Sequence, residues 1–238
     1  MHARWTLLLT LLALTLPLQT VSAQRKVSAQ ARVQTVMDGK VTTVTKTLYC
    51  QANGRMVTVF SDPYPYYVIT NPLGESQLYI PSTHEVMQQT SEEYSDRDDL
   101  IYLFLSGRVE DMGLVYFGYS LVSSQREGDG IVKKTFRTTA AGKVPTVEVV
   151  TQNQLPIYLA YIDAGGKVLS RTYLSEYTRL PRFTMPARVT NIAYTQARDS
   201  VITRTTYSQI QVDVDDPHFS FQVPADAKPV RAAGPKRP

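Results

Sequence analysis

The sequence predicts a mainly β protein of the α+β class, built on one large antiparallel sheet. Thr, Val, Tyr and Ile dominate residues 29–223 and alternate with other residues at a period of two, which is typical of strands. Turn motifs such as Asp38-Gly39 separate these runs at short intervals. Residues 81–107 instead carry most of the helix formers. We therefore expect a curved sheet of about 11–12 strands and a helical lid or plug from the middle of the chain.

Five short strands come first and follow one another as an antiparallel meander. Asp38-Gly39 predicts a tight hairpin turn between the first two strands, and Asn53-Gly54 marks the next turn. The five strands are expected at 29–38, 41–50, 55–60, 66–70 and 76–80.

The middle of the chain has the signals of helices. Ser82 is a suitable N-cap, and Ser95 or Asp96 is a second one. Gly107 is a natural helix stop. The stretch Leu100–Leu105 is apolar on all sides, so a helix there must be covered on most sides or must face an apolar cavity.

Strands resume after this segment and continue almost to the end of the chain. A sheet of about a dozen strands must curl or close, and a helix-rich plug would hide its apolar face. We divide the chain into a signal peptide at 1–23, one β-rich domain at 24–224 and a tail at 225–238 that is expected to be disordered. The later strands are expected at about 114–123, 131–138, 146–151, 156–162, 168–177, 185–194, 200–212 and 218–223.

Residues 1–23 have the parts of a secretory signal peptide. Arg4 supplies a positive charge ahead of the apolar run 5–18. Small residues follow, and we expect cleavage after Ala23. A membrane anchor is the alternative, but the run is shorter than the roughly 20 residues that a span needs. The mature chain is therefore expected to be soluble and exported, without the cysteine of a lipid-anchored protein.

The composition argues against several classes of function. The chain of 238 residues has a formal net charge of +4, which is too small to favour nucleic acid as a partner. A single cysteine, Cys50, excludes an internal disulfide framework, and three histidines leave little room for a metal centre. Cys50 is expected to be a small buried hydrophobe, with a free reactive thiol as the alternative. The 15 Tyr and 7 Phe suit strands, interfaces and amphipathic ligands.

No pattern of residues indicates catalysis. His84 and Glu85 are adjacent and would not face each other on a helix. Acidic residues gather at 92–99 and at 213–216, but a solvated helix start and a polar turn are the favoured interpretations, because neither has the spacing of a calcium loop. Motifs for hydrolases, nucleotide binding and zinc proteases are absent from the sequence. We expect no enzyme activity, no cofactor and no metal.

Six features follow one another in residues 53–86, which read NGRMVTVFSDPYPYYVITNPLGESQLYIPSTHEV. They are a turn, a strand, a break with prolines, an apolar strand, a glycine turn and an aromatic-bearing strand. The end of the chain keeps a matching order and closes with Phe219–Pro224, which is similar to a final strand. In this order of elements, residues 30–230 resemble the LolA-like family of outer-membrane lipoprotein-sorting carriers.

The resemblance implies an unclosed barrel whose concave side is filled by helices and whose cavity holds acyl chains. It implies a periplasmic, non-catalytic carrier or binding protein for lipids or the acyl chains of lipoproteins. Inner- or outer-membrane proteins are possible partners, and nucleic acid is not. Burial of each methylene group contributes about 0.8 kcal/mol, so a partly enclosed lipid binds well. The alternatives are a cell-envelope sensor or scaffold that binds a protein through the same sheet, and an exported hydrolase.

The sequence departs from the family pattern in two places. The family has a helix before its first strand, whereas few residues separate the expected cleavage site from the strand at 29–38. Carriers of the family also place an arginine just before the turn at Asn53-Gly54, where it helps to hold the lid. Ala52 occupies that place here, and Arg55 follows the turn, so we do not transfer the role to Arg55.

Candidate cavity residues follow from the alternation along the strands and from the apolar helix. The alternative is that they form an ordinary packed core without a void. The candidates are Met56, Phe60, Tyr66, Val68, Leu78 and Ile80 on the strands, and Leu100, Ile101, Phe104 and Leu105 on the helix.

Overall fold

The computed structural model describes residues 25–62, 64–89, 100–181, 183–195 and 199–230. The expected signal peptide and the acidic residues at 92–99, with the N-cap candidates Ser95 and Asp96, lie outside these ranges. The strands are β1 (Lys26–Met37), β2 (Lys40–Gln51), β3 (Met56–Asp62), β4 (Tyr66–Thr70), β5 (Ser76–Ile80), β6 (Glu85–Gln89), β7 (Ser120–Arg126), β8 (Ile131–Arg137), β9 (Thr146–Gln152), β10 (Leu155–Ile162), β11 (Val168–Arg179), β12 (Thr184–Tyr194), β13 (Ser200–Val212) and β14 (Lys228–Val230). The helices are α1 (Leu100–Leu105) and the 3₁₀ turn η3 (Pro217–Ser220).

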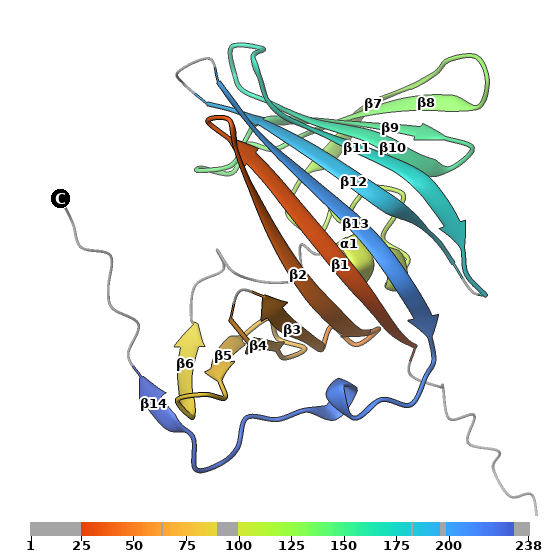
Figure 1. The fold of residues 1–238 in the computed structure, drawn as a ribbon. Coiled ribbons are helices and arrows are strands. Elements are labelled where there is room, and N and C mark those ends of the chain that lie inside the picture. The colour runs from red at the N-terminus through yellow and green to blue at the C-terminus, as the bar shows by residue number, and fades with distance from the viewer. Residues whose placement is uncertain (1–24, 63, 90–99, 182, 196–198, 231–238) are drawn as a thin grey trace, which may run out of the picture.

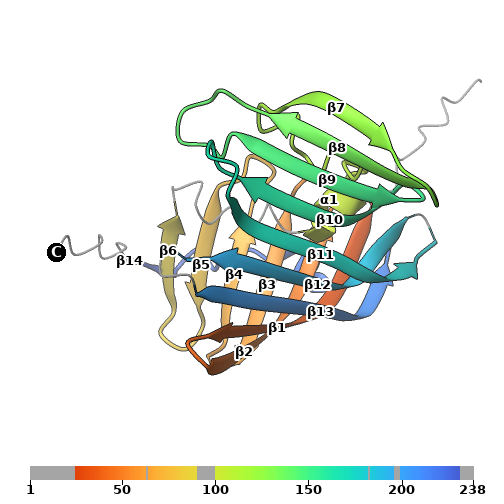
Figure 2. The ribbon, with the colours of Figure 1, turned by 90° about the horizontal axis from the view of Figure 1, so that it is seen from above.

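The fourteen described strands form a single sheet in the order β14-β6-β5-β4-β3-β2-β1-β13-β12-β11-β10-β9-β8-β7. All neighbours are antiparallel except β14 and β6, which run parallel. The end strands β14 and β7 do not pair with each other, so the sheet is unclosed. It curves around α1, which lies on its concave side (Figure 1, Figure 2).

The predicted fold class is confirmed in its main part. The chain is mostly β with one large unclosed sheet, but the described strands number fourteen where about 11–12 were expected. The predicted helical lid or plug is not confirmed, because α1 has six residues and is the only α-helix in the described ranges. Residues 85–89 form β6 where a helix was expected, since Val86 alternates into an apolar cluster with Ile69 and Tyr79. Residues 228–230, in the expected tail, form β14.

The main core lies between α1 and the concave face of the sheet. Ile101, Phe104 and Leu105 are buried, and α1 contacts β2 and β12 from this side. Cys50 is fully buried in the same core, as the sequence predicted for a small hydrophobe. A six-residue helix is too short to be stable alone, so α1 depends on this burial.

A C-terminal strap, residues 213–230, passes over the outer face of β2 to β6 and ends in β14 (Figure 1). Phe221 stacks on Tyr67 of β4, with ring centres 4.5 Å apart, and packs against an apolar cluster on this outer face. The strand predicted at 218–223 is wrong, because this part of the strap is irregular after η3. The buried members of the outer cluster are Val57, Ile69 and Tyr79.

Side-chain donors explain why this segment does not form a strand. Arg55 donates hydrogen bonds to the backbone carbonyls of Phe219 and Phe221, and Gln51 Nε2 donates to the Phe219 carbonyl at 2.7 Å. These carbonyl groups are therefore satisfied by side chains rather than by a neighbouring strand. Arg55 holds the strap on the outer face and has no hydrogen bond to α1 within the described part of the chain.

Replacement of Phe104 by Ala tests whether α1 is an integral part of the core. Phe104 is 2% exposed, so Phe104→Ala should lower the free energy of unfolding by about 3–5 kcal/mol. Urea unfolding measures the change. Leu73→Ala is the control, because Leu73 is 76% exposed and should change stability by less than about 0.5 kcal/mol. Equal stability of both variants would contradict the packing described here.

Asp216 fastens the start of the strap in a way that depends on pH. Its carboxylate accepts a hydrogen bond from the backbone N–H of His218 at 2.8 Å and lies 2.7 Å from Nδ1 of the same residue. Burial would raise the pKa of Asp216, but the hydrogen bonds from His218 lower it below the usual value of 3.8. Such a group adds stability above its unfolded pKa and loses it as the pH falls through its folded pKa.

Asp216→Asn should therefore lower the free energy of unfolding near neutral pH, and its difference from the wild type should shrink as the pH falls below 3.8. Urea unfolding at a series of pH values measures this difference. Asp215→Asn is the matched control, because the adjacent Asp215 side chain is exposed and has no hydrogen bond or ion pair with a described residue. A difference that is the same at every pH would count against the assignment.

Candidate functional site

The strand register brings the six predicted strand residues to one face of the sheet. Residues directly opposite each other in an antiparallel pair share a face. Phe60 lies opposite Tyr66, and Met56 lies opposite the core residue Cys50, so this face is the concave one. The six residues are Met56, Phe60, Tyr66, Val68, Leu78 and Ile80.

Four of the ten predicted site residues are packed in the main core. Met56, Ile101, Phe104 and Leu105 are at most 2% exposed and belong to one cluster of buried side chains. Leu100 is half-buried and packs against the same cluster. Their contribution to ligand binding stays a prediction.

The other five predicted residues are half-buried and extend the concave face beyond the core. Phe60 and Tyr66 stack with ring centres 4.1 Å apart, and Lys46 Nζ lies 5.8 Å from the centre of the Phe60 ring. This part of β3 to β5 therefore presents an apolar and aromatic surface that is still partly exposed. The remaining members are Val68, Leu78 and Ile80.

A pocket of about 840 Å³ opens between the turn after α1 and the concave face of β7, β8 and β9. This volume falls in the range of roughly 300–1,000 Å³ that small-molecule sites occupy. None of the ten predicted site residues lines it. The lining combines charged, polar and apolar side chains, and includes Val109, Glu110, Arg126, Val132, Lys134 and Thr151.

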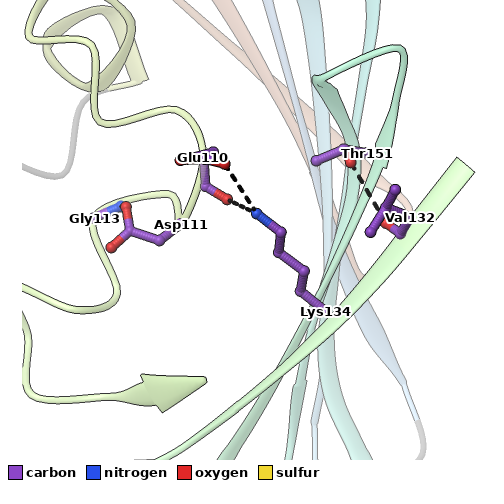
Figure 3. A network of polar contacts seen from close by, with 6 residues as sticks. All are labelled: Glu110, Asp111, Gly113, Val132, Lys134 and Thr151. Atoms are coloured by element: carbon purple, nitrogen blue, oxygen red, sulfur yellow. Dashed lines mark hydrogen bonds and ion pairs between the residues drawn. The ribbon is translucent and has the colours of Figure 1, made fainter. Parts of the chain in front are cut away.

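An ion pair spans this pocket from the sheet to the turn (Figure 3). Lys134 Nζ lies 3.5 Å from Glu110 Oε1 and donates a hydrogen bond to the Glu110 carbonyl at 3.3 Å. The Lys134 side chain is 19% exposed, whereas that of Glu110 is 91% exposed. The cation is thus inside the pocket, and the carboxylate faces solvent.

The turn over the pocket has its own hydrogen bonds. The Asp111 carboxylate, which lies beside Gly113 in Figure 3, accepts from the backbone N–H groups of Gly113 at 3.1 Å and Val115 at 3.0 Å. Met112 and Gly113 adopt left-handed φ angles of 51° and 75°, and Met112 is buried in the main core. Asp111 therefore stabilises a strained turn whose residues Met112 and Leu114 are buried in the main core.

Tyr119 anchors the far end of the same segment. Its hydroxyl donates a hydrogen bond to the Val144 carbonyl at 2.9 Å. Burial raises the pKa of Tyr119, which keeps the phenol neutral and able to donate. Residues 106–119 are thus held at both ends over the concave face.

The sequence could not tell which of two adjacent lysines faces inward. Lys133 lies on the outer face, 2.8 Å from Glu148 Oε1, whereas Lys134 lies opposite the buried Val149. One signal in the sequence could have identified Lys134 as the inward-facing lysine. Phe136, two residues after Lys134, is apolar and shares a face with it. Without the position of the turn after α1, however, that face gives no indication of a pocket.

Among the described residues, no group of three or more His, Cys, Asp or Glu side chains is placed to hold a metal ion. His84 Nδ1 lies 3.1 Å from the Tyr79 hydroxyl, on the outer side of the sheet. The described part of the chain contains no helix that is long and apolar enough to cross a membrane.

The role of Asp111 is tested by Asp111→Ala. Loss of its two hydrogen bonds should speed amide hydrogen exchange at 113–119, because local opening becomes easier, while the free energy of global unfolding changes by only about 1 kcal/mol. Asp163→Ala is a matched control, since the Asp163 carboxylate accepts from two backbone N–H groups in the β10–β11 turn. It should speed exchange only in its own turn, and equal effects at 113–119 would refute a local role for Asp111.

No family model matches this sequence, and no curated protein matches it. Solved structures match its fold. A LolA superfamily protein from Nitrosomonas europaea has a TM-score of 0.55 at 9% identity, over 81% of this chain and 87% of that one. An outer membrane lipoprotein-sorting protein domain from Vibrio parahaemolyticus has a TM-score of 0.55 at 11% identity, over 84% and 90%. A DUF1329 family protein from Desulfovibrio piger has a TM-score of 0.58 at 14% identity, over 83% and 90%.

At these identities the matches concern the fold alone. They confirm, at the level of fold, the resemblance that begins at residue 53: this chain has the fold of LolA superfamily proteins.

Proposed function

We propose that this chain is an exported, non-catalytic carrier or binding protein of the periplasm, for lipids or the acyl chains of lipoproteins. The observation that carries the proposal is the concave face of the unclosed sheet. Its core is covered by α1, while five of the six predicted residues on β3 to β5 are apolar and half-buried. Exposed apolar surface of this kind marks binding sites for apolar ligands or partners.

An acyl chain suits this surface for energetic reasons. Phe60 and Tyr66 already form a stacked aromatic wall, and burial of each methylene against such a wall contributes about 0.8 kcal/mol. Release of a lipid requires a cover that can move. Residues 106–110 are suited to this because their ion pair is solvent-exposed, whereas 112–119 is anchored in the main core.

The structural neighbours support the same class of function. Two of them are named as a LolA superfamily protein and as a lipoprotein-sorting domain, and both share the fold. Because fold alone does not determine function, the concave face of this chain carries the proposal and the names support it.

A cell-envelope protein that binds a protein partner through the sheet is the second candidate. The edge strand β7 favours it, because Leu121 and Val122 are 50% and 51% exposed on a strand with one free side. An extended segment of a partner could add to such an edge. This candidate predicts capture of an envelope protein that is lost on Val122→Pro, with lipid binding absent.

Phe60→Glu tests the lipid proposal on the mature, delipidated protein. A charge on the concave face should weaken binding of a fluorescent fatty acid by about tenfold or more, because the carboxylate must be desolvated or repels the chain. The fold should survive, since Phe60 is half-buried and Lys46 is near enough to offset the new charge. Fluorescence titration measures binding, and circular dichroism checks the fold.

Gln77→Glu is the matched control on the neighbouring strand β5, because Gln77 lies opposite Ile69 and therefore faces the outer side of the sheet. It should bind the probe as the wild type does. If the delipidated wild type binds neither the fatty acid nor a lipopeptide, the proposed function is wrong.

A further inference from the structure

We infer that the pocket beside Lys134 receives the anionic head group of an amphiphilic ligand, with Arg126 and Lys134 as its counter-charges. The inference rests on the proposed function and adds the chemical class of the ligand: a carboxylate or phosphate joined to an apolar chain. The charge and position of these two side chains carry it, together with the burial of Lys134, since Arg126 itself is exposed.

The register places both cations on one face. Arg126 on β7 lies opposite Val132 on β8. Lys134 is two residues after Val132 on β8, so all three side chains face the pocket. Diagonal neighbours of this kind have Cα atoms about 7–8 Å apart, which long side chains can bridge. A single carboxylate or phosphate between them can accept hydrogen bonds from both.

The two cations are poorly neutralised by the protein itself. The Arg126 side chain has no hydrogen bond or ion pair with any described residue. Lys134 has Glu110 as a partner, but that carboxylate is 91% exposed and mostly solvated, so the pair contributes little. An anion that enters the pocket meets Lys134 at 19% exposure, where screening by water is weaker.

Apolar side chains continue from this charged end into the concave face. Val109 and Val132 line the pocket itself. Lys134 lies opposite Val149, which is fully buried in the main core, and Phe136 follows on the same face. A chain attached to the head group would therefore lie against Val109 and Val132 in the pocket, at the edge of the packed core, and an apolar wall beside a charged end is the arrangement that an amphiphile needs.

Glu110 competes with the ligand in this arrangement. Its carboxylate occupies the position beside Lys134 Nζ that an incoming anion would take (Figure 3). Because Glu110 is nearly fully exposed, its removal should not disturb the fold. The pair therefore predicts opposite effects: loss of Lys134 weakens anion binding, and loss of the Glu110 charge strengthens it.

The experiment compares a fluorescent fatty acid with its methyl ester on the mature, delipidated protein. The ratio of the two dissociation constants measures the preference for the acid. In the wild type we expect the acid to bind about tenfold tighter. Lys134→Gln and Arg126→Gln should each reduce the ratio to about threefold or less, and Glu110→Gln should raise it about threefold.

Lys133→Gln is the matched control. Lys133 precedes Lys134 on β8 but lies on the outer face with Glu148, so the ratio should equal that of the wild type. The change of ratio in the other variants should also shrink at high salt, since it depends on charge. Circular dichroism of each variant checks the fold.

Three outcomes would overturn the inference. If the wild type binds acid and ester equally, the head-group site is wrong while the proposed function stands. If it binds neither, both are wrong. The third outcome concerns a site for free anions, which calorimetry with inorganic phosphate tests. Phosphate should bind at least about a hundredfold more weakly than the fatty acid, because it has no chain to bury. Equal affinity would show a site for free anions instead of amphiphiles.

Discussion

Burial of the apolar helix α1, with four of its six residues buried, against the concave face of an unclosed sheet is the constraint on which the rest of this structure depends. A sheet of fourteen strands must curve, and its inner face must be covered. Leu100–Leu105 cannot be stable as an isolated helix and has no polar side, so helix and sheet stabilise each other. Because the helix has only six residues, it fills the centre of the concave face and leaves both flanks to other elements.

The two flanks differ in chemistry. On β3 to β5 the flank is apolar and aromatic, with Phe60 stacked on Tyr66. On β7 to β9 it is a pocket with Arg126, Lys134 and an exposed carboxylate at its mouth. The packed core around α1 lies between the two flanks. The proposed function draws on the apolar flank, and the inferred head-group site lies on the charged one.

The outer face is closed by different interactions. The strap buries Val57, Ile69 and Tyr79 under Phe221, and Arg55 and Gln51 hold its backbone by hydrogen bonds. The apolar side chains on the outer face of β3 to β5 are thereby used for folding. Half-buried apolar residues also remain on the concave side of these strands, where a ligand can use them.

Local patterns in the sequence determined the strands, the hairpin turns and the apolar helix, because period-two alternation, Asp38-Gly39 and the run Leu100–Leu105 act over a few residues. The same alternation placed Met56, Phe60, Tyr66, Val68, Leu78 and Ile80 on one face. Only the tertiary structure decided that 85–89 is a strand and that 218–223 is not. One side of β6 is paired by the distant β14, and Arg55, far earlier in the chain, takes the carbonyl groups of Phe219 and Phe221. The pocket beside Lys134 was likewise invisible, because a cavity is set by how far the turn after α1 stands from the sheet, and no local pattern encodes that distance.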